Sequence, residues 1–144
     1  MTDLPDKSEV LARAELFTRV DDATLGRIAE VAAFRHYEEG DVVYQMGDEA
    51  EHVFVLASGR VRFTLGVGNR PGSGGAIMTS RMTFGWAALV DERPRRVATA
   101  SCLEPTVLLA IDGRRLLEIL EQDTASGFLV MRRLASMIAR NFLE

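Results

Sequence analysis

Residues 38–63, EEGDVVYQMGDEAEHVFVLASGRVRF, alternate between short apolar runs and tight turn signals. The runs are rich in β-branched and aromatic residues and lie at 41–45, 52–57 and 60–65. EEGD, MGDEAE and SGR supply the turns between them. In the last run the period is two, which places Val61 and Phe63 on the inner face and Arg62 on the outer face. Short strands joined by such turns predict an antiparallel β-roll.

Further β-like runs flank this stretch at 33–37, 76–80, 96–102 and 106–111. The glycine-rich run 66–75, GVGNRPGSGG, is typical of a hairpin loop. It lacks the Lys-Ser/Thr ending of a phosphate loop. We therefore predict a roll of about eight strands over residues 34–112.

Helices are predicted before the roll, in residues 1–33. Ser8 can cap the first helix, which extends to about Phe17, and Asp21 or Asp22 suits the start of the second. One face of the second helix is apolar at i, i+3, i+4 and i+7 spacing: Leu25, Ile28, Ala29 and Ala32.

Helices are also predicted after the roll, in residues 113–144. Asp112 can cap the first of them, and Asp123 or Thr124 can cap a long last helix. The three parts together predict one α+β domain over residues 1–144.

The last helix carries an apolar stripe in alternating three- and four-residue steps: Phe128, Met131, Ala135, Ile138 and Phe142. Such a stripe suits the seam of a parallel homodimer, and packing back onto the roll is the alternative. Three arginines are expected on the solvent side: Arg132, Arg133 and Arg140.

The composition narrows the function classes. The net charge of −4 gives no global attraction to nucleic acid. The single cysteine, Cys102, excludes an internal disulfide and fits the cytoplasm. No apolar run reaches the roughly 18 residues of a membrane span. His36 and His52 are too isolated for a metal site or a catalytic triad, so we expect no metal and no enzyme.

Residues 84–99, FGWAALVDERPRRVAT, have the profile of a small phosphate site. Gly85 precedes a short helical turn whose first N–H groups, at Ala87 and Ala88, lack intrahelical partners. Arg95 and Arg96 follow and can grip a phosphate through charge-assisted hydrogen bonds. A solvated arginine pair beside an ordinary turn is the alternative.

These stretches resemble the cyclic nucleotide-binding domain family, which includes the catabolite activator protein and kinase regulatory subunits. The roll stretch matches at its turn residues, and 84–99 resembles the phosphate-binding cassette, Phe-Gly-Glu-Leu-Ala followed by Pro-Arg-Ala-Ala-Thr. The resemblance implies a phosphate-binding segment made of Gly85, Trp86, Ala87, Ala88, Arg95, Arg96, Val97, Ala98 and Thr99. Matching Ala98-Thr99 to the family pattern selects Arg96 for the phosphate, with Arg95 as the alternative.

Trp86 departs from the family, which has a glutamate there that accepts a hydrogen bond from the ribose 2′-hydroxyl. An indole has one donor and no acceptor. Losing the charge-assisted bond costs about 1.5–3 kcal/mol, which weighs against ordinary cAMP or cGMP binding. Trp86 can plug the pocket, stack on a ligand or pack into the core. Val97 also stands where some members carry a phosphate-binding serine.

Three functions follow from the resemblance. The first is a non-catalytic sensor of a nucleotide or other small anion that signals through its last helix as a homodimer. The second is a ligand-free interaction protein whose pocket is filled by Trp86. The third is the sensor fragment of a Crp/Fnr-type transcription regulator, and we expect no DNA binding by this chain alone.

Overall fold

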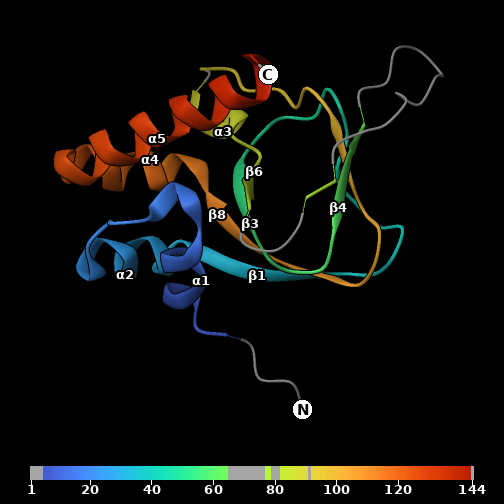
Figure 1. Cartoon of the computed structure of the whole chain (residues 1–144), viewed down its shortest axis with the longest axis horizontal. Coiled ribbons are helices and arrows are strands. Elements are labelled where there is room, and N and C mark those ends of the chain that lie inside the picture. Colours follow the sequence, from blue (N-terminus) through green and yellow to red (C-terminus); the bar gives the residue numbers. More distant parts are fainter. Residues whose placement is uncertain (1–4, 65–76, 79–81, 91, 144) are drawn as a thin grey trace.

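A computed structural model describes residues 5–64, 77–78, 82–90 and 92–143 (Figure 1). Helices from both ends of the chain gather on one side of a β-roll. The predicted α+β class is therefore confirmed. The predicted hairpin loop at 66–75 lies outside the described residues.

The roll consists of two antiparallel four-stranded sheets, with the orders β1-β8-β3-β6 and β2-β7-β4-β5. The strands of the first sheet are β1 (Ala32–Tyr37), β3 (His52–Ser58), β6 (Thr83–Phe84) and β8 (Thr106–Asp112). The strands of the second are β2 (Val42–Tyr44), β4 (Val61–Thr64), β5 (Ile77–Met78) and β7 (Thr99–Cys102). The sequence analysis did not predict β6 as a separate strand. The predicted start of β7 was also three residues too early, because Arg96 and its neighbours lie in the segment before this strand.

The first sheet separates two hydrophobic clusters, and β3 alternates between them. Val53 and Val55 belong to the helical core, which lies between this sheet and the helices. Phe54 and Leu56 belong to the roll core, which lies between the two sheets. Period-two alternation in one buried strand thus supplies both cores.

The N-terminal helices differ in some details from the prediction. Asp6, not Ser8, caps α1 (Lys7–Arg13), because the Asp6 carboxylate accepts the Ser8 N–H at 2.9 Å. The helix also ends before Phe17, and a 3₁₀ turn, η1 (Glu15–Phe17), follows. The predicted start of α2 (Asp22–Glu30) is confirmed, since Asp21 accepts the Thr24 N–H at 2.8 Å, and Leu25 and Ile28 are buried as expected. Ala32, which was expected on the same helical face, instead begins β1, because the helix ends at Glu30.

Both predicted C-terminal caps are present. Asp112 accepts the Arg115 N–H at 3.0 Å at the start of α4 (Gly113–Gln122). Asp123 accepts the Ser126 N–H at 3.2 Å near the start of α5 (Thr124–Leu143). The Thr24 hydroxyl also donates to Asp123 at 2.6 Å, so this carboxylate joins α2 to α5.

One face of α5 is buried against the helical core through Val130, Leu134 and Met137. The stripe expected at a dimer seam lies beside that face. Phe128 is 69% exposed and Ala135 is exposed, while Met131 and Ile138 pack partly on the helical core. The side chain of Phe142 lies outside the described part of the chain.

Two of the three arginines expected on the solvent side of α5 instead hold it to the N-terminal segment. Arg133 donates to the carbonyl oxygens of Glu15 (2.9 Å) and Thr18 (2.8 Å). Arg140 forms an ion pair with the Glu15 carboxylate. Arg132 is exposed, as expected. These contacts tie α5 to both the backbone and the side chain of the η1 segment.

Candidate functional site

The cassette begins where β6 ends, at a glycine that the backbone requires. Gly85 has φ of +82°, a region that residues with a side chain rarely adopt. A Cβ there would lie 2.9 Å from Arg96 Nη1 and 3.1 Å from the His52 carbonyl oxygen. Gly85 therefore lets the chain turn into α3 (Ala87–Val90) while an arginine lies against its backbone.

Arg96 is the buried arginine of the site, with 5% of its surface exposed. Its Nη1 donates to the carbonyl oxygen of Gly85 at 3.0 Å, and its Nη2 donates to that of His52 at 2.7 Å. Its Nε is buried and has no hydrogen-bond partner among the described residues. The guanidinium thus joins the cassette to β3 and keeps one donor unused.

Aromatic rings surround this guanidinium. Its carbon lies 4.2 Å from the ring centroid of Tyr44 and 5.6 Å from that of Phe54. Phe54 stacks on Phe84 at 5.2 Å, and Phe63 meets Phe84 edge-on at 5.1 Å. A cation over aromatic faces is attracted by their quadrupoles. The inner face of the roll is therefore apolar with a single buried positive charge among the described side chains.

Burial and charge act in opposite directions on the two partners of this stack. Burial raises the pKa of Tyr44 to about 12, and the positive charge of Arg96 opposes the rise. Burial lowers the pKa of Arg96, while Tyr44 and Asp48 raise it. Guanidinium remains protonated in proteins, so at neutral pH the pair is a cation over a neutral phenol.

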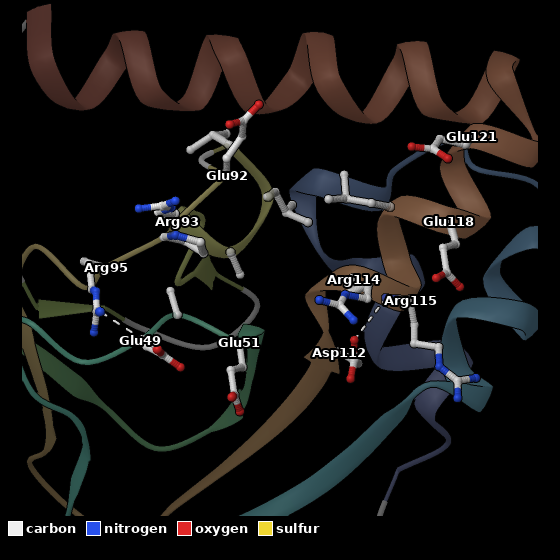
Figure 2. A pocket seen from close by; sticks show the side chains of 16 residues that line it. Glu49, Glu51, Glu92, Arg93, Arg95, Asp112, Arg114, Arg115, Glu118 and Glu121 are labelled. Carbon is white, nitrogen blue, oxygen red and sulfur yellow. Dashed lines mark hydrogen bonds and ion pairs between the residues drawn. The ribbon is translucent and has the colours of Figure 1, made fainter.

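Arg95, the alternative phosphate arginine, points the other way. Its side chain is 63% exposed and lies 3.9 Å from the Glu49 carboxylate (Figure 2). It also makes a long hydrogen bond of 3.4 Å to the Gly47 carbonyl oxygen. Arg95 forms an isolated antiparallel bridge with Glu49, and the Arg96 N–H donates to the Asp48 carbonyl oxygen at 2.8 Å. Consecutive residues in such paired backbone point to opposite sides.

Trp86 does not belong to the roll core. Its indole is half-buried and packs against the helical core, and its Nε1 donates to the Thr83 carbonyl oxygen at 3.0 Å. Of the three interpretations from the sequence, this placement corresponds to packing in the core. The position that carries the ribose-binding glutamate in the resembling family therefore offers no acceptor side chain here.

Three other cassette residues form no hydrogen bond with the Arg96 side chain in the described part of the chain: Ala88, Val97 and Thr99. The Ala88 N–H makes only a 3.4 Å hydrogen bond, to the Gly85 carbonyl oxygen. Val97 is 71% exposed. Thr99 accepts the Met46 N–H at 3.0 Å and so ties β7 to the loop after β2. Among the described residues, Arg96 and the Gly85 turn form the center of the site.

Sequence reasoning missed the aromatic partners. Tyr44 and Phe54 come from β2 and β3, far from the cassette in sequence. The alternation of β3 could have indicated that Phe54 faces inward with Leu56. No sequence pattern could have indicated the His52 carbonyl group, because every residue has a backbone carbonyl.

A shallow groove of about 1090 Å³ lies on the outer side of the cassette, between it and α4 (Figure 2). Charged side chains of both signs line it, and α5 crosses above it. The labelled side chains are Glu49, Glu51, Glu92, Arg93, Arg95, Asp112, Arg114, Arg115, Glu118 and Glu121. The mixed charges favor neither anions nor cations.

Metal and thiol chemistry have little support in the described residues. They contain no group of three His, Cys, Asp or Glu side chains that could hold a metal ion. Cys102 is buried on β7, and burial raises the pKa of its thiol, which disfavors the reactive thiolate. No helix in the described segments is long and apolar enough to cross a membrane.

Comparison with solved structures shows the same architecture. The sensor domain of the transcriptional regulator DNR from Pseudomonas aeruginosa superposes with a TM-score of 0.79, at 20% identity over 95% of this chain and 91% of that one. The catabolite activator protein of Thermus thermophilus gives 0.74, at 25% identity over 89% of this chain and 58% of its own. The regulatory domain of Toxoplasma gondii PKA, solved with cAMP, gives 0.71, at 17% identity over 79% and 43%.

A curated protein of Rhodopseudomonas palustris, named "Putative potassium channel protein RPA4233", is 27% identical over 114 residues. The match covers 79% of this chain but only 27% of that protein. Residues 34–123, more than half of the chain, match the cyclic nucleotide-binding domain family. Together with the roll, the cassette turn and the buried arginine, this match shows that the chain belongs to the cyclic nucleotide-binding domain family.

Proposed function

We propose that the protein is a non-catalytic, ligand-sensing regulatory module that binds a cyclic nucleotide or a related phosphate ligand at Arg96. The observation that carries the proposal is that Arg96 is 95% buried and that its Nε has no hydrogen-bond partner in the described part of the chain. A buried donor without a partner is costly, and an anionic ligand would satisfy it.

A phosphate can compete for this arginine on favorable terms. The present partners of Nη1 and Nη2 are neutral carbonyl oxygens. Hydrogen bonds between a guanidinium and a phosphate are charge-assisted and about twice as strong as neutral ones. We propose that the ligand also meets the backbone N–H groups at Ala87 and Ala88, at the start of α3.

The ribose is where this chain differs from a cAMP sensor. Trp86 supplies no acceptor, so the 2′-hydroxyl of cAMP or cGMP gains no charge-assisted bond there. The proposed ligand class is therefore set by the phosphate and by the aromatic inner face. Both features favor a flat, anionic small molecule.

Signaling to the last helix follows from packing. A Cβ at Gly113 would lie 2.9 Å from Ala88 Cβ, so the cassette helix α3 packs directly on the start of α4. Helix α4 in turn packs along α5. A ligand that shifts α3 would move α5 and its apolar stripe, which we propose as a homodimer seam.

A ligand-free interaction protein is the second candidate. Two carbonyl groups and the Tyr44 ring already hold Arg96, so the cassette is closed without a ligand. Closure by this arginine, rather than by Trp86, is the observation that favors it. A sensor fragment of a longer regulator would use the same ligand site.

Calorimetric titration with cAMP, cGMP, 5′-AMP and ADP tests the proposal. We expect saturable binding that Arg96→Ala weakens at least tenfold, since a charge-assisted contact of about 1.5–3 kcal/mol is lost. Arg95→Ala is the matched control, because it removes the same charge one residue away on the exposed side. Trp86→Glu should raise the affinity for cAMP.

If the folded wild-type protein binds none of the four nucleotides, the sensor proposal is contradicted and the ligand-free interaction protein remains. Equal weakening by the two arginine variants would also contradict the assignment, since it would indicate a general charge effect.

A further inference from the structure

A second arginine, Arg35, lies near the inner face of the roll. It comes from β1, on the edge of the first sheet opposite to β6. Arg35 is exposed. Its register partner on β8 is Leu108, whose partner on β3 is Leu56, so all three lie on the sheet face that carries Phe54. Phe54 pairs with Ala110 on β8, whose own partner on β1 is Ala33, so the β8 and β1 side chains of the row beside Arg35 are small.

The two arginines converge on the same residues. The Arg35 guanidinium carbon lies 5.9 Å from the Phe54 ring centroid, and that of Arg96 lies 5.6 Å from it. Arg35 Nη2 lies 3.3 Å from His52 Nε2, while Arg96 Nη2 donates to the His52 carbonyl oxygen. Phe54 and His52 thus stand between two permanent positive charges.

The state of His52 agrees with this placement. Burial, followed by the charge of Arg35, lowers its pKa; Asp112 and Glu51 raise it, and Arg96 lowers it further. Neutral His52 accepts a hydrogen bond at Nε2, as the contact with the Arg35 donor requires. The positive charge beside Phe54 at neutral pH therefore comes from the two arginines.

A hollow of about 400 Å³ adjoins Arg35 on this face. Its lining includes Arg35 and His52 together with the short side chains of Ala33 and Ala110. Arg115 and two carboxylates, Glu30 and Asp112, also line it. The Asp112 carboxylate is engaged as the α4 cap, where it accepts the Arg115 N–H.

We propose that Arg35 is a second anion-binding arginine, so that the roll selects a ligand with two or more negative charges, such as a nucleoside monophosphate or diphosphate, over a singly charged cyclic diester. This inference rests on the proposed function, since it takes Arg96 as the first anion contact. Two cations around one apolar ring are mutually repulsive, and a dianion relieves that repulsion better than a monoanion. The loss of the ribose acceptor at position 86 points the same way, because the affinity then depends on phosphate charge.

Calorimetry with 5′-AMP and cAMP at pH 8 tests the inference, since the two share base and sugar and differ by one charge. We expect the wild-type protein to bind 5′-AMP about tenfold more tightly, the value of one charge-assisted contact. Arg35→Gln should abolish this preference by weakening 5′-AMP alone. Arg62→Gln is the matched control, because Arg62 is an exposed strand arginine on the outer face of β4.

The outcomes separate the two proposals. Equal affinities for 5′-AMP and cAMP, both lost in Arg96→Ala and both unchanged in Arg35→Gln, overturn the role of Arg35 and leave the sensor in place. A preference for 5′-AMP that Arg62→Gln removes equally would overturn it as well, as a general charge effect. Absence of binding by every folded variant overturns the sensor, and the inference with it.

Discussion

The two faces of the sheet β1-β8-β3-β6 carry different kinds of side chains. Toward the helices, the buried side chains of β3 and β8 are aliphatic: Val53, Val55, Leu109 and Ile111. Toward the roll, the same strand β3 presents Phe54 beside Tyr44, Phe84 and the buried charge of Arg96. Aliphatic side chains stabilize the fold by burial and need no hydrogen-bond partners. The roll face holds a buried cation, which needs hydrogen-bond or charged partners. The helical side stabilizes the domain through aliphatic packing, and the contrast supports the proposal that the roll side binds the ligand.

The largest expected effect is a loss of stability in the helical core. Phe17 is fully buried there, so Phe17→Ala should lower the free energy of unfolding by about 3–5 kcal/mol. Urea denaturation followed by circular dichroism measures it. Phe128→Ala is the matched control, since this phenylalanine is 69% exposed and its loss should change stability by less than about 0.5 kcal/mol. Similar losses in both variants would contradict burial in the helical core as the source of this stability.

A smaller effect is expected on the roll side, at Gly85. In Gly85→Ala a side chain must adopt φ near +82°, which costs about 1–2 kcal/mol, and its Cβ displaces Arg96 Nη1. Denaturation and calorimetry together should show a modest loss of stability and a larger loss of phosphate binding.

Gly26→Ala is the control for this variant. Gly26 lies within α2, and a Cβ there meets no atom within 4 Å among the described residues. The replacement should therefore stabilize the protein by about 0.5–1 kcal/mol and leave binding unchanged. Unchanged phosphate binding in Gly85→Ala would show that the cassette turn does not position Arg96.

Much of this division could be predicted from local sequence. The alternation in residues 60–65 predicts the inner face of β4, and Asp21, Asp112 and Asp123 cap helices as their positions indicate. Counting back from Ala98-Thr99 to the family pattern selects Arg96 over Arg95, and Arg96 is the one of the two that lies buried. These features depend on residues close together in the chain.

The features that could not be predicted depend on residues far apart. Trp86 packs toward the helices because tertiary contacts and the Thr83 carbonyl decide the direction of its ring, and composition does not. Arg133 resembles any surface arginine of a helix until η1, 115 residues or more away, supplies its acceptors. The ring cluster around Arg96 likewise assembles from separate strands, through pairings that no local pattern specifies.

The smallest expected effect concerns Asp123, which joins the helices outside either core. Hydrogen bonds from Ser126 and then Thr24 hold the pKa of Asp123 below its usual value. A lowered pKa in the folded state means that the stabilization is complete above the ordinary pKa of aspartate and is lost as pH falls through the folded value. Asp123→Asn should therefore lower Tm at pH 7 and make little difference at pH 2.

Trp86 fluorescence can follow this transition on the helical side, because the single tryptophan packs against the helical core. Asp22→Asn controls for the change in net charge, since Asp22 lies in the exposed first turn of α2. An Asp123→Asn deficit in Tm that is the same at pH 7 and pH 2 would show that the carboxylate acts through its shape rather than its charge. Because Asp123 does not contact the roll core, phosphate binding at pH 7 should be the same in Asp123→Asn as in the wild-type protein, which separates the two faces by function as well as by stability.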